Sequence, residues 1–436
     1  MCDVVIVGAG CAGLAAAAEL RRAGVEDVTI LEARTRIGGR IHTLREAGVA
    51  VPVELGAEMV HGAPDETLGI VDAAGLLAVE LAGRHYRAER GRVAPADDFF
   101  RYVAEVMRRL DPDVSPDRPV AEALDAPGLQ DLPEEARRAA LRYVEGFHAA
   151  EPERMSARVL AEAEAGGPGG GQSATRILDG YDRVPEWLAA QASGARLRLG
   201  TVARRIEWRK GAVTVRGADR WSGDRTVDAA AAVVTVPVGV LAAGAGEEGA
   251  VAFEPPLPEA HRRALAHQAM GSVAKVVFRF SRAFWTDRLE GMSFLHLADG
   301  PFEVWWSTHP VRAPLLVAWS GGPGAAALAA TSESELQRLA LHDLAAHLGM
   351  PAAALAAEVE AAWHHDWTRD PFARGAYSYT LVGGEGSGEA LARPIEGTVF
   401  LAGEAMAPGG RSGTVDGAIA SGRRAARHAL AALGRR

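Results

Sequence analysis

Short apolar runs that end at glycines or acidic residues mark both ends of the chain. Residues 3–7 (Asp-Val-Val-Ile-Val) end at a glycine-rich turn, and a helical pattern follows over residues 14–23. A second apolar run, residues 28–31, ends at Glu32. Because short, nearly continuous apolar runs are typical of strands buried on both faces, this order predicts a strand, a tight turn, a helix and a second strand.

The last part of the chain repeats this pattern. Residues 398–402 form an apolar strand followed by Glu404, and the glycine-rich loop 409–417 opens a helix over residues 419–433. Residues 230–236 form another nearly continuous apolar run, which predicts a buried parallel strand. These strands are expected to complete one sheet with those of the N-terminus.

The first turn carries a glycine pattern that suits a dinucleotide. Gly8 permits the turn, Gly10 lets the backbone approach a pyrophosphate, and Gly13 lets the helix pack against the strand. The helix start offers free N–H groups to phosphates, and Glu32 is placed to accept hydrogen bonds from a ribose. Because Glu32 would repel a 2′-phosphate, FAD or NAD is favoured over NADP. A glycine turn without a ligand is the alternative.

Length and pattern together predict an α/β protein of two domains, since 436 residues exceed one ordinary hydrophobic core. Residues 1–75, 175–255 and 385–436 are expected to form a discontinuous Rossmann-type (GR2-like) domain that binds the cofactor. Residues 76–174 and 256–384 are expected to form an α+β substrate domain, built on a mixed sheet with a helical insertion. The glycine-rich run 166–171 is a candidate crossing between the two domains.

Composition and charge argue against several other classes of protein. The net charge is −9, which gives no support for nucleic-acid binding, because that needs a basic face. The two cysteines, Cys2 and Cys11, indicate no disulfide framework. The sequence shows neither a signal-peptide pattern nor a long apolar run, so we expect a cytoplasmic protein without a membrane span.

Lysine is rare in this chain, and one lysine lies in an unusual place. Lys210 and Lys275 are the only lysines among 47 basic residues. Lys210 lies in a predicted hairpin turn, whereas Lys275 lies inside the apolar strand predicted over residues 270–280, on the same face as Val273 and Val277. Because lysine is a compact donor that arginine does not replace, Lys275 is a candidate site residue. A lysine at a sheet edge whose side chain extends to water is the alternative.

Three other segments carry candidate chemistry. Loop 34–40 places two glycines between arginines, which suits close approach to an anion, although an ordinary surface turn is equally compatible. Segment 53–62 changes from a strand into a glycine loop and contains His61, a candidate for lining a site. Residues 363–378 are dense in aromatic and polar side chains. Two adjacent histidines there point to opposite faces of a strand, so no metal site is expected.

Taken together, these segments resemble the flavin-containing amine oxidases, the family of the monoamine oxidases and polyamine oxidases. The resemblance extends over nearly the whole chain and is closer to the polyamine oxidase branch. It rests on turn 8–13 with Glu32, loop 34–40, segment 54–62, the Lys275 strand, and residues 367–378 and 404–417.

The resemblance implies FAD in an extended pose. Glu32 would bind the adenosine ribose, Val202 would contact adenine through its backbone, and Arg40 would lie near the pyrophosphate. Glu404 would hold the ribityl chain, and the start of the last helix would face the pyrimidine end of the ring. The implied cofactor-binding residues are Gly8, Gly10, Gly13, Glu32, Arg34, Gly39, Arg40, Ala57, Glu58, Met59, Val202, Glu404, Gly413, Thr414 and Val415.

The resemblance also implies the reaction. A hydride would pass from the carbon beside a neutral amine nitrogen to flavin N5, the imine would be hydrolysed, and O2 would reoxidise the flavin and give H2O2. Lys275 would hold a water against N5, Trp367 and Tyr377 would wall the substrate, and His61 completes the catalytic set. The expected partners are a small-molecule amine and O2, with no nucleic acid, no membrane and no metal, and a homodimer is left open.

Two positions depart from the monoamine oxidase pattern. Ala376 replaces the cysteine that bonds covalently to the flavin, so FAD is expected to bind noncovalently. Thr414 replaces the second tyrosine of the aromatic cage, as in polyamine oxidases and histone demethylase relatives. The chain shows no chromatin-binding module and no membrane-anchoring tail, so neither a nucleosomal nor a membrane role is expected.

Two other functions stay open at this point. A flavin-dependent desaturase of the phytoene or protoporphyrinogen oxidase type shares the N-terminal segments, but it has no need of Lys275 or of the aromatic residues Trp367 and Tyr377. A flavoprotein that binds FAD without turnover would carry the same motifs.

Overall fold

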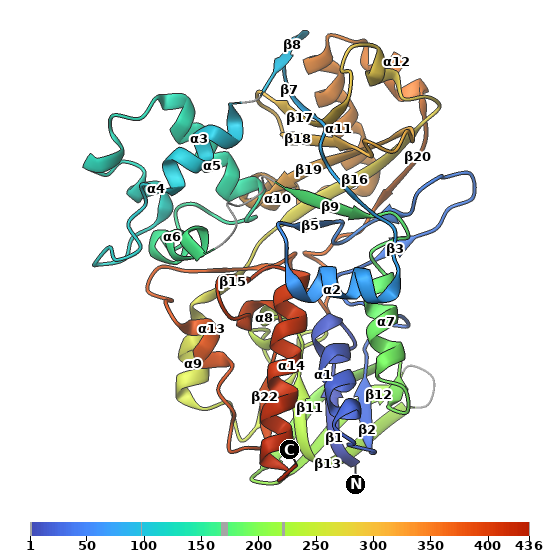
Figure 1. The fold of residues 1–436 in the computed structure, drawn as a ribbon, viewed down its shortest axis with the longest axis vertical. Coiled ribbons are helices and arrows are strands. Elements are labelled where there is room, and N and C mark those ends of the chain that lie inside the picture. Colours follow the sequence, from blue (N-terminus) through green and yellow to red (C-terminus); the bar gives the residue numbers. More distant parts are fainter. Residues whose placement is uncertain (1, 97, 167–172, 220–222, 436) are drawn as a thin grey trace.

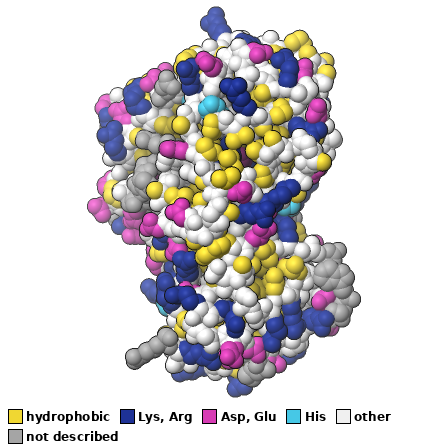
Figure 2. All heavy atoms as spheres, turned by 45° about the vertical axis from the view of Figure 1, so that its right-hand side comes forward, with side chains coloured by type: hydrophobic (Ala, Val, Ile, Leu, Met, Phe, Trp, Pro, Cys, Tyr) yellow, Lys and Arg dark blue, Asp and Glu magenta, His cyan; other side chains and the backbone are white. Residues whose placement is uncertain are grey.

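The computed structural model describes residues 2–96, 98–166, 173–219 and 223–435, which form two lobes joined at a waist (Figure 1). Both chain termini lie in one lobe, which is built on an eight-stranded sheet. The other lobe holds a seven-stranded sheet with a group of helices beside it. Figure 2 shows the same waist, and on that face arginine and acidic side chains are interspersed. None of the described helices is long and apolar enough to cross a membrane.

The eight-stranded sheet joins the two ends of the chain. The end of β13 (Gly223–Val234) pairs in parallel with both β1 (Cys2–Val7) and β22 (Val399–Leu401), which confirms the buried parallel strand predicted over residues 230–236. The start of β13 belongs to an antiparallel meander. The other strands of this sheet are β2 (Val28–Leu31), β10 (Arg196–Arg198), β11 (Thr201–Arg209), β12 (Ala212–Asp219) and β14 (Ala252–Glu254).

Helices cover this sheet. On one face α1 (Cys11–Arg22) lies beside α14 (Val415–Ala432), and their backbones are so close that a Cβ on Gly422 would lie 2.0 Å from the Ala12 carbonyl oxygen. On the other face Ala264 of α9 (Glu259–Ala266) joins the core. Part of the predicted substrate domain thus packs on the first sheet. The remaining helices of this lobe are α2 (Asp65–Ala74), α7 (Arg183–Gln191), α8 (Val238–Leu241), α13 (Ser387–Leu391) and the 3-10 turn η3 (Glu404–Met406).

The seven-stranded sheet is mixed, as predicted, because β17 pairs in parallel with β7 while the other pairs are antiparallel. In β16 (Val273–Phe280), Val276 and Phe278 face a core shared with α11 (Glu333–Leu348), and Lys275 and Val277 face the other side. This is the alternation that the sequence predicts. The other elements are β7 (Arg84–Glu89), β8 (Arg92–Pro95), β17 (Met292–Leu297), β18 (Val304–Ser307), β19 (Leu315–Gly321), β20 (Val359–His364), α10 (Gly322–Leu328), α12 (Ala352–Ala357) and the 3-10 turn η2 (Phe284–Asp287).

The predicted helical insertion is a group of helices with a core of its own, which includes Val106, Ala140 and Leu160. Gly166 ends the last of these helices, and the rest of the predicted link 166–171 lies outside the described residues. The group consists of α3 (Phe99–Met107), α4 (Val120–Ala123), η1 (Pro127–Leu129), α5 (Glu134–Gly146) and α6 (Ala157–Gly166).

Small sheets connect the lobes. β9 (Ala174–Ile177) pairs with both β5 (Met59–His61) and β6 (Ala78–Glu80). This one sheet contains residues from both predicted domains, whose limits were expected at residues 75 and 174. The domain limits stay a prediction. The strand predicted over residues 270–280 is interrupted at Gly271, whose backbone exchanges hydrogen bonds with Ala376 and Tyr377. The elements involved are β3 (Thr43–Leu44) with β4 (Val53–Glu54), and β15 (Gln268–Met270) with β21 (Ser378–Thr380).

Candidate active site

The glycine turn leaves the start of α1 open. Gly8 has φ +106°, and a Cβ on Gly13 would lie 1.9 Å from the Gly8 carbonyl oxygen, so packing requires both glycines. A Cβ on Gly10, in contrast, would meet nothing nearer than the Cα of Gly39 at 4.0 Å. No side chain among the described residues caps this helix start. Its free N–H groups and the room beside Gly10 therefore suit a pyrophosphate.

Glu32 lies beside this turn at the end of β2. Its carboxylate accepts hydrogen bonds from the backbone N–H groups of Ala9 and Arg34, both at 2.8 Å. The N–H of Thr201 donates to the Glu32 carbonyl at 2.8 Å, which brings the neighbouring Val202 to the same corner. The structure thus brings Glu32 and Val202 together, and their contacts with ribose and adenine stay predictions.

Glu404 connects segments from both ends of the chain. Its Oε1 accepts a hydrogen bond from Arg40 at 2.8 Å, and its Oε2 accepts from Ser378 Oγ at 2.6 Å and from the N–H of Gly413 at 2.9 Å. Arg40 also donates to the carbonyl of Ala376 at 2.8 Å. Three of the predicted cofactor-binding residues, Arg40, Glu404 and Gly413, therefore form one hydrogen-bonded group around a buried carboxylate.

The start of α14 makes a further connection, which the sequence did not predict. Thr414 caps the helix with its own hydroxyl. Asp416 accepts hydrogen bonds from the backbone N–H groups of Glu66 and Thr67 at 2.9 and 3.0 Å, and so satisfies the start of α2. The cofactor contacts of Thr414 and Val415 stay predictions.

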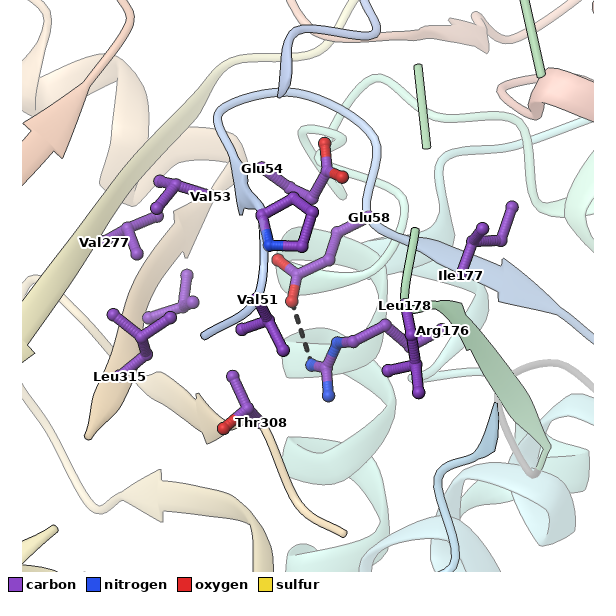
Figure 3. A pocket seen from close by; sticks show the side chains of 12 residues that line it. Val51, Val53, Glu54, Glu58, Arg176, Ile177, Leu178, Val277, Thr308 and Leu315 are labelled. Carbon is purple, nitrogen blue, oxygen red and sulfur yellow. Dashed lines mark hydrogen bonds and ion pairs between the residues drawn. The ribbon is translucent and has the colours of Figure 1, made fainter. Parts of the chain in front are cut away.

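Lys275 is buried, with 3% of its side chain exposed. Its Nζ donates to Glu58 Oε2 at 2.7 Å and to the carbonyl of Gly56 at 3.1 Å. Glu58 Oε1 accepts from Arg176 at 2.9 Å, a pair drawn in Figure 3, and from the indole N–H of Trp306 at 3.0 Å. The ammonium does not extend to water, so the alternative of an edge lysine is wrong.

His61, Phe147 and Tyr377 form an aromatic corner. The rings of His61 and Phe147 meet edge to face with centroids 4.9 Å apart, and the Tyr377 hydroxyl donates to the Phe147 carbonyl at 2.7 Å. Burial raises the pKa of Tyr377, which keeps its phenol neutral at ordinary pH. Two of the predicted catalytic residues therefore contact the same residue at the end of α5, and their catalytic roles stay predictions.

Trp367 and Arg34 lie in a second, more buried group. The Trp367 indole is 3% exposed, donates to the Leu55 carbonyl at 2.8 Å and packs on the His365 ring at 4.1 Å between centroids. Arg34 forms an ion pair with Asp370 at 2.7 Å. These contacts tie the N-terminal loop to the aromatic-rich segment. Direct contact of Trp367 with substrate and of Arg34 with cofactor stays a prediction.

The remaining candidates lie on the loops around these groups. The N–H of Ala57 donates to the Arg40 carbonyl at 3.3 Å, Met59 pairs with Arg176 between β5 and β9, and Gly39 has φ +60° beside the glycine turn. Their cofactor contacts stay predictions. Within the described residues, no group of three histidine, cysteine or acidic side chains could hold a metal.

Sequence reasoning missed Arg176, Trp306 and Phe147. Arg176 is 6% exposed in a short strand between Thr175 and Ile177, which is a weaker form of the signal that singled out Lys275. Trp306 and Phe147 carry no such signal, because aromatic residues in apolar segments are ordinary core residues.

Comparison with known proteins finds one family that matches nearly the whole chain. A model of the family described as flavin containing amine oxidoreductase matches residues 11–430. Polyamine oxidase 1 of Oryza sativa subsp. japonica is 30% identical, over 90% of this chain and 87% of that protein. Lysine-specific histone demethylase 1 homolog 3 of Arabidopsis thaliana is 28% identical over 97% of this chain, which spans 29% of that protein. The solved structure of cyclohexylamine oxidase from Brevibacterium oxydans IH-35A has a TM-score of 0.81 and 25% identity, with 100% of both chains covered.

The residues of the site fit the cofactor of this family. FAD carries a pyrophosphate, which the open start of α1 suits, and a ribose, which Glu32 is placed to bind. The family match shows that FAD is the cofactor and that the substrates are amines. The chain therefore belongs to the flavin-containing amine oxidoreductases.

Proposed function

We propose that this protein oxidises a small or extended amine at the carbon beside its nitrogen, with O2 as the final acceptor. FAD supplies the hydride acceptor and the route to O2, which gives H2O2. The imine is hydrolysed to a carbonyl compound and ammonia or a shorter amine. The observation that carries this proposal is that two groups of candidate site residues contact the same segment, 54–62. In this segment Glu58 forms an ion pair with Lys275, and the His61 ring packs against Phe147.

The residues of the chain have separate tasks in this proposal. Lys275 binds a water beside the flavin, and its buried ammonium is held for that purpose by Glu58 and Gly56. His61 and Tyr377 present an aromatic surface to the amine. Because an amine surrounded by apolar groups loses its proton more easily, this surface favours the neutral amine that can give up a hydride.

The substrate class is tested by mixing the purified yellow protein, without oxygen, with a panel of monoamines, polyamines and amino acids. A true substrate bleaches the flavin absorbance at a rate that accounts for turnover. Rapid bleaching by diamines and polyamines but not by short monoamines assigns an extended amine, and the opposite order assigns a small one. Bleaching by none of these amines contradicts the proposal.

Two other functions are less favoured. A phytoene or protoporphyrinogen type of desaturase has no need of a buried ammonium, yet Lys275 is buried and ion-paired here. The same panel of amines distinguishes a flavoprotein without turnover from an oxidase, because no amine would bleach the flavin of the former. We propose further that the protein is cytoplasmic and that O2 is its physiological acceptor. The mass of the protein in solution distinguishes a homodimer from a monomer.

We also propose that FAD is bound noncovalently. Ala376 stands at the position of the cysteine that forms the flavin bond in monoamine oxidases, and its backbone is engaged by Arg40 and Gly271. Acid precipitation is expected to release all the yellow colour into solution. Colour that stays on the precipitated protein contradicts this part.

A further inference from the structure

Glu58 is the centre of a buried group of charges. The side chains of Lys275, Glu58 and Arg176 are 3%, 10% and 7% exposed. Burial alone would raise the pKa of the Glu58 carboxyl. The charges of Lys275 and Arg176, with hydrogen bonds from Lys275 and Trp306, outweigh burial and lower this pKa to about 2. Glu58 is therefore an anion at any working pH.

This arrangement determines how the ammonium of Lys275 can act. An ammonium has three N–H donors, and here two of them are directed at Glu58 Oε2 and at the carbonyl of Gly56. Glu58 cannot turn away, because its other oxygen holds Arg176 and Trp306. The third N–H of Lys275 is thus left for a further acceptor, in a direction that Glu58 and Gly56 define.

A cavity of about 20 Å³ lies beside Glu58 and Arg176 (Figure 3). Thr308 also lines it, and so does Glu54, whose pKa burial raises to about 7. The Arg176 Nη1 is buried and has no hydrogen-bond partner among the described residues. A water needs roughly 10–15 Å³ and at least two polar partners. The cavity is therefore of the right size for one water between Arg176 Nη1 and the hydroxyl of Thr308.

We propose that Glu58 is the positioning residue of Lys275: held by Arg176 and Trp306, with one cavity water bonded to Arg176, it keeps the ammonium charged and aims the third N–H at the cofactor. The proposal rests on the role of Lys275 in the proposed function. Its physical basis is that a buried ammonium without a carboxylate partner gives up its proton. Two cations share one carboxylate here, so the group carries one net positive charge when Glu54 is neutral.

The scarcity of lysine makes this testable without turnover. Lysine labelled with carbon-13 at Cε gives two NMR signals, from Lys275 and from the exposed Lys210, which serves as the internal reference. In Glu58→Gln, the Lys275 signal is expected to show loss of charge at a pH at least about one unit lower than in the wild type, a tenfold change in proton affinity. An unchanged titration of Lys275 in Glu58→Gln overturns the proposal.

Matched variants separate positioning from a general effect on the fold. Glu58→Asp keeps the carboxylate, so Lys275 is expected to lose its charge at nearly the same pH as in the wild type. Glu54→Gln changes a buried carboxyl of the same cavity that is not hydrogen-bonded to Lys275 and acts on it through charge alone, so it is expected to shift the Lys275 titration by clearly less than Glu58→Gln does. If Glu58→Gln alone does not fold, Glu58→Gln with Arg176→Met keeps the net charge of the group and permits the same measurement. Equal shifts in Glu54→Gln and Glu58→Gln contradict the assignment to Glu58.

The rates of flavin reduction by amines and of flavin reoxidation by O2 distinguish a failure of this inference from a failure of the proposed function. In the holoprotein, Glu58→Gln is expected to slow reoxidation of the flavin by O2 at least about tenfold. Glu58→Asp is expected to reoxidise at nearly the wild-type rate. If the lysine signal shifts but no amine reduces the flavin, the charge group is confirmed and the proposed function fails. If amines reduce the flavin and the lysine signal does not shift, the function stands and this inference fails. A crystal structure without a water at Arg176 Nη1 overturns the cavity assignment.

Discussion

Arg40 donates a 2.8 Å hydrogen bond to Glu404, a residue 364 positions further along the chain. The pair joins the loop after β2 to the turn before α14, and both side chains are largely buried. Because Glu404 also accepts from Ser378 and Gly413, one carboxylate holds together segments that the sequence assigns to the same cofactor.

Glu404→Gln is expected to weaken FAD binding by roughly 10- to 100-fold, since a hydrogen bond to a charged group contributes about 1.5–3 kcal/mol. Titration of the apoprotein with FAD, followed by fluorescence, measures this. Glu396→Gln, which changes an exposed acid in the loop before β22, is the control and should bind FAD normally. Unchanged affinity in Glu404→Gln means that this carboxylate serves the fold alone.

Gly10→Ala is expected to keep the fold and lose the cofactor. The added Cβ meets no protein atom nearer than 4.0 Å, so the melting temperature of the apoprotein should change by only a few degrees. In a bound pyrophosphate complex the same methyl group stands where the phosphates approach the backbone, so FAD affinity should fall at least about tenfold. Gly69→Ala, in α2 and without neighbours within 4 Å, is the matched control. Normal FAD binding by Gly10→Ala would place the pyrophosphate elsewhere.

Lys275→Met is expected to retain FAD and to lose most turnover, at least about tenfold, because it removes the buried cation to which the proposed function assigns a water beside the flavin. Steady-state oxygen consumption and the flavin spectrum of the same sample measure both effects. Lys210→Met changes the exposed hairpin lysine and should leave both unchanged. Equal turnover in wild type and Lys275→Met rejects the assigned role.

Glu54 is expected to make the stability of the protein depend on pH. Burial raises the pKa of this carboxyl from 4.5 to about 7, against hydrogen bonds from Thr43 and Tyr181. The folded state therefore binds this proton more tightly than the unfolded state. The resulting stabilisation is complete below about pH 4.5 and is lost as the pH rises through about 7, by up to roughly 3 kcal/mol.

Glu54→Gln should remove this contribution, because an amide does not titrate. Denaturant unfolding of wild type and variant at several values between about pH 5 and pH 8 measures the two slopes. The variant is expected to lose less stability over this range, whatever its stability at the acidic end. Parallel pH profiles would show that Glu54 is not the group responsible.

The sequence predicted those features that depend on local pattern. The glycine turn, the buried strand over residues 230–236 and the two faces of β16 follow from hydrophobic period and the special geometry of glycine. The side chains that hold Glu58 could not be predicted, because they come from distant segments. Arg176 is brought there by the pairing of β9 with β5, and Trp306 lies in β18. The predicted strand over residues 270–280 breaks at Gly271 for the same kind of reason, since a distant backbone at Ala376 and Tyr377 pairs with it.

The most direct test of the account is a two-step flavin measurement on the purified protein. Mixed with an amine in the absence of oxygen, the bound FAD should lose its oxidised absorbance, and admission of O2 should restore it with one equivalent of H2O2 for each flavin. A protein that is colourless and does not take up FAD, or whose flavin stays oxidised with every amine tested, contradicts the account.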